Sequence, residues 1–421
     1  MIRLTNRLFG THPIATHCPG PLHNGWHFFA EAVMGCPVDP RPAQESLTLL
    51  TWNTGDRPEK PNGLMERCVA RHGCSTLVLG EGCTWSGQLK LESTAKALQQ
   101  VTTDYVIGLD SGDVLLVNHP DCIVERFRQH FACELLFNAT GSECWPAAPE
   151  FIMFESSLPG ASWSQGRCWL NAGAWVGRIE FCREYFSALA TGPPHPLFDD
   201  DQSAVKQSWP HWYPRVQIDY RSEIFQWFNE DRTILQIERP RADRQIQLVE
   251  WLGQIQPLRS GVEVGVFDGA TSDVLLLEFP ELSLWLVDPW RPSNAMPEMA
   301  GLTAGDFELA RQKALWWTSH AANRRFEMRL DSLAAVRHFP DQSLSFAFID
   351  ADHGYESVLS DLQAWWPKIH SGGMLCGHDY GVYGDADGSW GVRQAVDEFA
   401  AGHRLRVDTG RDGMWRLLPA S

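Results

Sequence analysis

Two series of short apolar runs constrain the fold of this chain more than any other feature of its sequence. The first series holds the runs SLTLLTW, STLVLG and DYVIGLD between residues 46 and 110, and stretches with helical spacing separate them. The second series begins with GVEVGVF at residue 261 and includes LSFAFID, which ends at Asp350. Strands that alternate with helices in this way predict sheets that are mostly parallel and covered by helices on both faces. We therefore expect an α/β protein with two doubly wound domains.

The length of 421 residues also predicts two domains, because a single hydrophobic core seldom extends beyond about 250–300 residues. Residues 1–45 show no periodicity, and we expect an irregular segment there. The first domain is expected at 46–230, a charged linker that contains Pro240 at 231–245, and the second domain at 246–421.

Composition excludes several classes of function. The net charge of −17 argues against non-specific nucleic-acid binding, which depends on clustered Lys and Arg. No apolar run approaches the roughly 20 residues that span a bilayer. The 11 cysteines form no CxxC pair, so free thiols and a cytoplasmic location are expected, and the sequence says nothing about the oligomeric state.

The run GVEVGVFDGATS at 261–272 predicts a strand, a glycine turn and a helix. Gly265 and Gly269 would let the backbone come close to a ligand. Asp288 ends the next strand, where an acid can bind the two hydroxyls of a ribose, although a surface acid is the alternative. Asp331 and Ser332 follow a further strand, near the place expected for an adenine, but an ordinary surface role is equally compatible with the sequence.

Two acids follow neighbouring apolar strands in the second domain. Asp350 ends LSFAFID and Asp379 follows GGMLCGH. Because ligands bind beyond the carboxyl ends of parallel strands, the two carboxylates are expected to converge and to hold Mg²⁺. His353 lies three residues after Asp350 and is the candidate general base for a hydroxyl, with a solvent-facing helix residue as the alternative. Asp352 is as compatible with a helix cap as with a place in the cluster.

Together these motifs make residues 245–421 resemble a class I S-adenosylmethionine-dependent methyltransferase, and in particular the metal-dependent O-methyltransferases. The resemblance rests on VEVGVFDGATS and on IDADHGYESVLSDLQAWWPKIHSGGMLCGHDY. It implies a seven-stranded sheet, with Glu263, Gly265, Phe267 and Gly269 lining the cofactor. It also implies a metal held by Asp350 and an acid pair that is His378–Asp379 here, which leaves His378 open as a ligand, a supporting group or a base.

The first domain carries acids at a comparable position. Asp110 and Asp113 lie in IGLDSGDVLLV, between two apolar runs. Two acids at this spacing in a turn can hold a divalent cation, which in turn can hold a nucleotide diphosphate.

Residues 46–228 resemble the glycosyltransferase domain of procollagen lysyl hydroxylases and of related collagen glycosyltransferases. The matching pieces include LTLLTWNTG, VIGLDSGDVLL, LLFNATGSECWP, WLNAGAWVG and FDDDQSAV. The resemblance implies a GT-A-like fold, a UDP-sugar donor, and Mn²⁺ at Asp110 and Asp113. It places Thr51 at the nucleotide, and it places Trp145, Asn171, Asp200 and Asp201 at donor or acceptor sugar, with Asp201 in a catalytic role. The family's third metal ligand, a His shortly after the IFQ segment at 224–226, is missing here, and His211 precedes that segment.

The sequence therefore predicts a bifunctional glycan-modifying enzyme, which transfers a sugar from a nucleotide-sugar and O-methylates a sugar hydroxyl of a glycan or glycoconjugate. Two alternatives remain open. The first domain could bind glycans without catalysis, or the methyltransferase could act on a small phenolic or natural-product acceptor.

Overall fold

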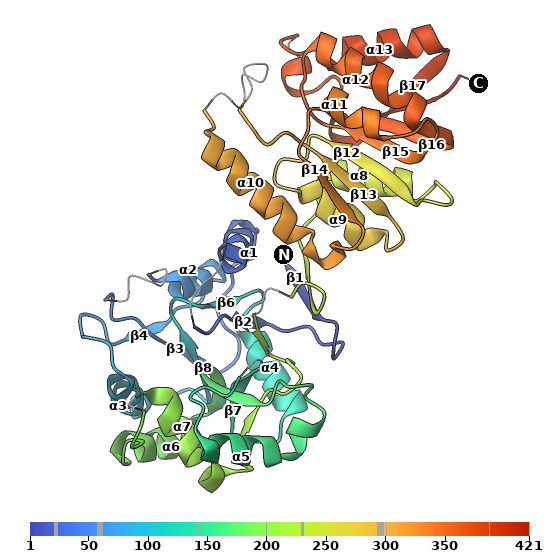
Figure 1. The fold of residues 1–421 in the computed structure, drawn as a ribbon. Coiled ribbons are helices and arrows are strands. Elements are labelled where there is room, and N and C mark those ends of the chain that lie inside the picture. The colour runs from blue at the N-terminus through green and yellow to red at the C-terminus, as the bar shows by residue number, and fades with distance from the viewer. Residues whose placement is uncertain are drawn as a thin grey trace. The chain divides into compact units, whose positions relative to one another are not determined.

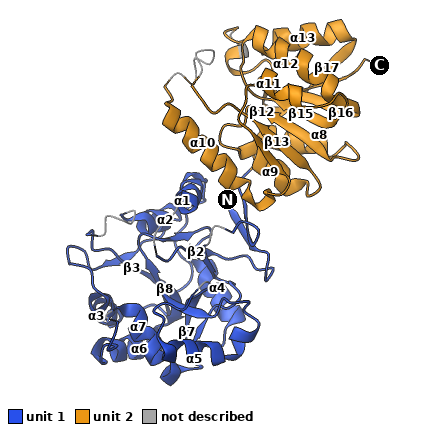
Figure 2. Cartoon of the chain, viewed as in Figure 1, with its two compact units in different colours: residues 1–240 blue, residues 241–421 orange. Residues whose placement is uncertain are grey.

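The computed structural model describes residues 1–20, 24–56, 62–141, 143–198, 200–228, 231–292, 299, 301–386 and 388–420 (Figure 1). The chain divides into two compact units, unit 1 at Met1–Pro240 and unit 2 at Arg241–Ser421 (Figure 2). Each unit has its own sheets and its own hydrophobic core.

A six-stranded sheet forms the centre of unit 1. Its order is β4 (Leu77–Leu79), β3 (Leu47–Trp52), β5 (Tyr105–Asp110), β8 (Trp169–Arg178), β7 (Leu135–Thr140) and β9 (Val216–Ile218). β8 runs antiparallel to both of its neighbours, whereas the other pairs are parallel. The expected parallel sheet is therefore mixed, because an apolar run such as that of β8 indicates burial on both faces but not the direction of the strand.

Helices cover this sheet and bury its aromatic residues. Trp175 of β8, Tyr185 of α6 and Trp209 of α7 are almost fully enclosed in the core between the helices and the sheet. The helices of unit 1 are α1 (Asn24–Gly35), α2 (Leu64–Arg71), α3 (Gly87–Leu98), α4 (Asp121–His130), α5 (Pro149–Ser157), α6 (Ile179–Thr191) and α7 (Asp201–Trp212).

The described part of the first 45 residues contains two strands and the helix α1, and this corrects the prediction of an irregular segment. β1 (Arg3–Asn6) pairs with β11 (Leu235–Glu238), and β2 (Ala15–His17) lies between β10 (Phe225–Trp227) and β6 (Val114–Leu116). Strands this short show no periodicity of their own, and their partners lie about 100 to 230 residues away along the chain. β11 also occupies part of the expected linker.

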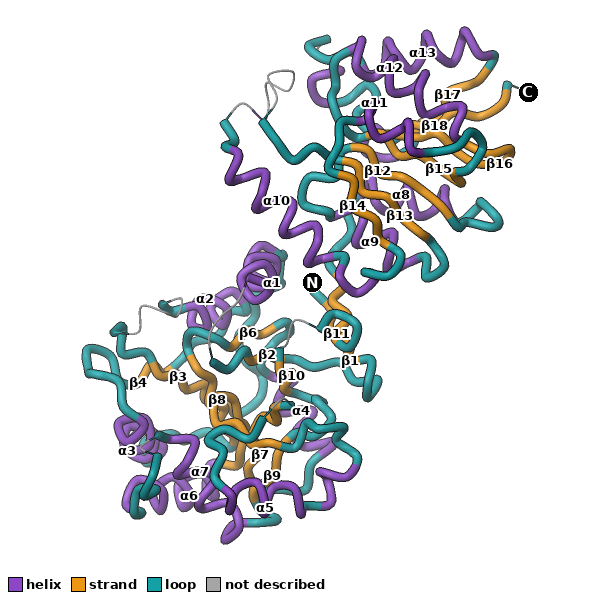
Figure 3. The backbone as a smooth tube through the Cα atoms, viewed as in Figure 1, coloured by secondary structure: helices purple, strands orange, loops and turns teal. Residues whose placement is uncertain are grey.

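Unit 2 is built on a seven-stranded sheet in which all strands but one are parallel, as the sequence predicted (Figure 3). β18 alone runs antiparallel to its neighbours. The order is β14 (Arg325–Met328), β13 (Ser283–Val287), β12 (Ser260–Val264), β15 (Leu344–Ile349), β16 (Ile369–Gly377), β18 (Trp415–Pro419) and β17 (Leu405–Thr409).

Helices lie on both faces of this sheet and produce two hydrophobic clusters. One cluster includes residues of α8 (Asp243–Leu252), α9 (Ala270–Glu278) and α10 (Ala304–Trp317). The other includes residues of α11 (Ser332–Ala335), α12 (Tyr355–Trp365) and α13 (Val392–His403). This arrangement leaves the carboxyl ends of the central strands β12 and β15 as the edge where a ligand can enter.

Two further observations concern the chain as a whole. Among the residues that the structure describes, no helix combines the length and the apolar character needed to cross a membrane. All 11 cysteines are free thiols.

Candidate functional site

The glycine turn after β12 is pressed against the end of β15. Gly265 has φ +87°, and a Cβ atom at this residue would lie 1.9 Å from the carbonyl oxygen of Asp350. Gly269 has φ +76°, and a Cβ atom there would lie 2.7 Å from Cα of Ala314. Both positions need glycine for conformation and for space. The close approach at Gly265 packs the turn directly against the backbone of Asp350.

Asp288 holds this turn in place. Its Oδ2 accepts hydrogen bonds from the backbone N–H groups of Val266 (3.0 Å) and Phe267 (2.9 Å), and its Oδ1 accepts one from Trp290 N–H (2.7 Å). Burial raises the pKa of Asp288, and these hydrogen bonds oppose the rise. The carboxylate still lines the cleft described next, so the expected ribose contact stays a prediction.

A cleft of about 670 Å³ opens beside the turn. Ser332 lines it while donating a hydrogen bond to Asp361 (2.5 Å), and Asp331 lines it while paired with Arg291 (2.8 Å). The other predicted residues that line the cleft are Gly265, Phe267, Asp288 and Asp350.

Two residues predicted to line the cofactor do not line this cleft. Glu263 is 2% exposed and accepts a hydrogen bond from the hydroxyl of Ser272, and burial raises its pKa to about 8. Gly269 is the residue before α9 and packs on α10. Glu263 is buried and bound to Ser272 of α9, and Gly269 lies against Ala314 of α10, so both support the turn from the core side.

Asp350, His378 and Asp379 meet at the edge of the same cleft. One donor atom from each lies within 4.8 Å of the others. His378 Nδ1 is 2.9 Å from Asp379 Oδ1 and 3.8 Å from Asp350 Oδ1, and its Nε2 is 3.5 Å from Asp412 Oδ2. Asp379 has φ +68°, a left-handed conformation that is rare for a residue other than glycine and that often marks a functional site.

His353 approaches this carboxylate cluster from the other side. Its Nε2 lies 3.0 Å from Asp379 Oδ2, and its ring stacks on Trp390 with centroids 4.0 Å apart. Burial opposes ionisation of Asp379, but its hydrogen bonds with His353 and His378 hold its pKa well below the usual range. Burial raises the pKa of Asp350, although His378 and Arg244 act against the rise.

The donor set fits a divalent cation. It combines two carboxylates and an imidazole in a largely buried position, and oxygen ligands with one nitrogen suit Mg²⁺ or Mn²⁺. His378, which the sequence left open, is therefore placed as a possible ligand. Asp352 lies outside the donor set, because its Oδ1 accepts the N–H of Gly354 (2.8 Å) just before α12, as a capping residue would.

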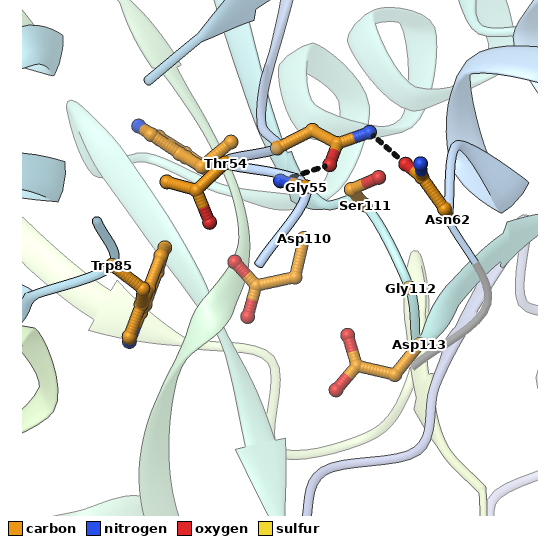
Figure 4. A pocket seen from close by; sticks show the side chains of 10 residues that line it. Thr54, Gly55, Asn62, Trp85, Asp110, Ser111, Gly112 and Asp113 are labelled. Atoms are coloured by element: carbon orange, nitrogen blue, oxygen red, sulfur yellow. Dashed lines mark hydrogen bonds between the residues drawn. The ribbon is translucent and has the colours of Figure 1, made fainter. Parts of the chain in front are cut away.

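A second cleft lies in unit 1, where β3 and β5 end (Figure 4). The side chains of Asp110 and Asp113 extend into its open space, and the indole of Trp85 stands on the opposite wall. Lys90, which is almost fully buried, binds Asp110 Oδ1 at 2.8 Å and Asp201 Oδ2 at 2.8 Å. Asp201 is thus linked to the acids of the cleft through a lysine.

The structure corrects two other predicted sugar-site residues. Thr51 is fully buried and donates a hydrogen bond to the carbonyl of Leu109 (2.7 Å), so it does not border the cleft. Asp200 caps α7 by accepting the N–H of Ser203 (2.6 Å), which was the structural alternative for this acidic loop.

Trp145 and Asn171, the other two residues expected at a sugar, lie outside this cleft. Trp145 is 68% exposed and precedes a cis proline. Asn171 accepts the N–H of Gly173 at 2.9 Å. Neither lines the cleft of Figure 4.

Sequence reasoning missed three charged or titratable residues at these sites. His17 joins Asp110 and Asp113 in a group whose donor atoms lie within 4.8 Å of one another. Lys90 lies in a helix that showed only ordinary helical spacing, and Arg244 in α8 reaches Asp350 at 3.4 Å. No local pattern marks any of them, because each reaches its site from an element distant in sequence.

The family-model comparison concerns unit 2. Residues 262–380 match the family model of a methyltransferase domain, a stretch that contains the glycine turn, Asp350 and Asp379. None of the curated proteins matches the chain in sequence.

Several solved structures are similar to part of the chain. The O-methyltransferase NovP is 18% identical, covers 42% of this chain and 80% of its own, and gives a TM-score of 0.31. A putative caffeoyl-CoA O-methyltransferase from Staphylococcus aureus is 14% identical. The match covers 42% of this chain and 84% of that protein, with a TM-score of 0.31. An O-methyltransferase family protein from Burkholderia thailandensis is 13% identical. The match covers 42% of this chain and 56% of that protein, with a TM-score of 0.31.

Proposed function

We propose that unit 2 transfers a methyl group from S-adenosylmethionine to a hydroxyl oxygen of an acceptor, with the help of a divalent cation. One observation carries this proposal: Asp350, His378 and Asp379 meet at the edge of the cleft that the glycine turn lines. Asp350 both lines the cleft and belongs to the group of three metal-binding candidates. A methyl donor in the cleft and an acceptor at the carboxylates would therefore be neighbours, and alignment of two reactants is a large part of catalysis.

The cleft has the size and lining that the methyl donor needs. Its volume of about 670 Å³ falls in the usual range of small-molecule sites. Phe267 and Leu333 offer apolar surface for a purine, and Asp288 offers carboxylate oxygens for ribose hydroxyls. S-adenosylmethionine supplies an electrophilic methyl group when it is bound there.

The carboxylate cluster prepares the acceptor oxygen in this proposal. A divalent cation bound by Asp350, His378 and Asp379 supplies positive charge that lowers the pKa of a nearby hydroxyl. His353 takes the hydroxyl proton, and Asp379, whose Oδ2 lies 3.0 Å from His353 Nε2, stabilises the imidazolium that results. The stacked indole of Trp390 fixes the plane of the imidazole.

A sugar hydroxyl is the acceptor we favour, and a small phenol is the alternative. The test is methyl transfer from labelled S-adenosylmethionine to a panel of glycosides and catechols, before and after treatment with EDTA and after Mg²⁺ is restored. We expect EDTA to abolish transfer and His353→Ala to reduce it about 10²- to 10⁴-fold. His338→Ala, at an exposed histidine of the same unit, is the matched control.

The outcomes separate the parts of this proposal. Transfer that survives both EDTA and His353→Ala would refute the metal-assisted mechanism. A folded chain that binds no S-adenosylmethionine in calorimetry would refute methyl transfer itself.

For unit 1 we propose transfer of a sugar from a nucleotide-sugar, which would make the whole chain a bifunctional glycan-modifying enzyme. The supporting observation is that Asp110 and Asp113 face a cleft with indoles and side-chain amides on its walls. Mn²⁺ bound at these acids would neutralise a diphosphate. Asp201, held by Lys90, is the candidate catalytic acid at this site. Mn²⁺-dependent hydrolysis of UDP-sugars that Asp113→Asn abolishes is the expected result, and its absence would favour a glycan-binding module.

A further inference from the structure

We infer that unit 1 binds a divalent cation through three side chains and that the third is the imidazole of His17, supplied by strand β2. The inference deepens the sugar transfer proposed for unit 1 and rests on it for its purpose, but it concerns cation binding alone. The chain lacks a histidine shortly after β10, and the structure supplies one from the strand beside β10.

Strand register brings His17 to the acids. In the small sheet of β10, β2 and β6, His17 lies opposite Trp227 on one side and opposite Val114 on the other. Asp113 immediately precedes Val114, and its carbonyl accepts the N–H of Cys18 at 2.9 Å. These backbone bonds on both sides fix the position of His17 relative to Asp113 without any contribution from its side chain.

The donor atoms converge on one region. His17 Nε2 is 3.7 Å from Asp113 Oδ2, and one donor atom from each of His17, Asp110 and Asp113 lies within 4.8 Å of the others. Lys90 engages Oδ1 of Asp110, so the carboxylate is oriented by the lysine while Oδ2 remains on the side of His17. Each residue thus presents one atom toward a shared space, as ligands of a cation do.

The backbone of β8 leaves that space open by using a glycine. A Cβ atom on Gly173 would lie 2.5 Å from His17 Nε2 and 2.8 Å from Asp110 Oδ2. The pairing of β7 with β8 passes from Phe137–Trp175 to Asn138–Asn171, so residues 172–174 bulge out of the ladder at this point. Bulges of this kind are common beside active sites, and this one brings a residue without a side chain to the donor atoms.

The second nitrogen of the His17 ring has its own contact. The side-chain amide of Asn138, which is fully buried, lies 3.2 Å from His17 Nδ1. A histidine that binds a metal through Nε2 donates a hydrogen bond from Nδ1–H. Metal binding by His17 therefore requires the Asn138 amide to turn so that its Oδ1, which has no hydrogen-bond partner among the described residues, accepts from Nδ1 in place of the amide nitrogen.

The acidic residues around this site favour the binding of a cation. The ammonium group of Lys90 pairs with Asp110 and with Asp201, while Asp113 lies close enough to Asp110 for the two carboxylates to repel each other. Carboxylates held together away from water are stabilised by a positive charge, and two oxygens with one imidazole nitrogen suit Mn²⁺. The competing explanation is that His17 and Asp113 pair with each other and bind no metal.

The test is Mn²⁺ binding by the full-length chain, followed by electron paramagnetic resonance. Asp350→Ala and Asp379→Ala are introduced together to remove the candidate site in unit 2. We expect one bound Mn²⁺, with an electron spin echo signal from a coordinated ¹⁴N nucleus. His17→Gln, which preserves size, is expected to weaken binding at least 10-fold and to remove the nitrogen signal.

Two further variants complete the design. His27→Ala, at an exposed histidine of α1, is the matched control and should bind Mn²⁺ as the parent does. Gly173→Ala should weaken binding without removing any ligand. Circular dichroism establishes that each variant is folded.

The inference would be overturned if the folded parent bound no Mn²⁺, or if His17→Gln bound Mn²⁺ unchanged and kept the nitrogen signal. Mn²⁺ binding through His17 in a chain that hydrolyses no UDP-sugar would support this inference and count against sugar transfer.

Discussion

The contact between Gly265 and Asp350 gives a sharp prediction, because a single methyl group at residue 265 should affect both halves of the proposed methyltransferase site. In Gly265→Ala the new Cβ would start 1.9 Å from the Asp350 carbonyl oxygen, which is itself backbone. The two segments would have to separate by about 1 Å to reach tolerable contact. The carboxylate of Asp350 would be carried along with its backbone.

The expected magnitude follows from this displacement. A misplacement of about 1 Å at a site can reduce the rate about 10²-fold, which corresponds to about 2.7 kcal/mol of transition-state stabilisation. The left-handed conformation adds about 1–2 kcal/mol of strain for alanine. We therefore expect weaker S-adenosylmethionine binding in calorimetry and about a 10²-fold lower kcat/KM for methyl transfer.

Gly372→Ala separates the two contributions. Gly372 has φ +86°, nearly the φ of Gly265, but no atom lies within 4 Å of its would-be Cβ. It should therefore lose stability through strain alone and retain cofactor binding. The reasoning would be refuted if Gly265→Ala bound S-adenosylmethionine and transferred methyl groups within about threefold of Gly372→Ala.

Three other predictions concern a buried ion pair, a helix cap and a buried carboxyl group. Lys206→Met should lower the free energy of unfolding by about 3–5 kcal/mol in urea titrations, because it leaves the buried carboxylate of Glu155 without the ammonium 2.8 Å away; a loss below about 1 kcal/mol would contradict this. Asp200→Ala should cost about 1 kcal/mol as a lost helix cap while any sugar transfer persists, and loss of transfer in a folded variant would restore a substrate role for Asp200. Burial raises the pKa of Asp361 to about 6, so its contribution to stability is present below pH 3.8 and is lost as the pH rises through 6. Relative to Asp361→Asn, the parent should lose about 2 kcal/mol of unfolding free energy between pH 4 and pH 6.5, and parallel pH profiles of the two would refute this.

The positions of site residues could be predicted from the sequence where the residue directly follows a long apolar strand. LSFAFI is an uninterrupted apolar run, and Asp350 follows it at once, so the edge of the sheet where this acid lies could be predicted. The same holds for Gly265 after β12 and for Asp379 beyond β16. Parallel strands place their carboxyl ends together, and this rule alone brings acids about 30 residues apart to one place.

The sequence predicts least where a site depends on short or distant elements. His17 belongs to a three-residue strand whose partners begin at Val114 and Phe225, and a run of three residues shows no period. The helix cap at Asp200 could not be predicted because a capping acid and a substrate-binding acid look alike in the sequence. Thr51 was misplaced because its position near the end of a strand does not reveal which way the last side chains point.

The pairing of β1 with β11 has a consequence for how the chain is made. Arg3 lies opposite Glu238, so β1 has no partner until more than 230 further residues have been synthesised. At about 5–20 residues per second, that strand waits on the order of 10 to 50 seconds. Pairing of β1 with β11 therefore comes only after nearly all of unit 1 has been synthesised.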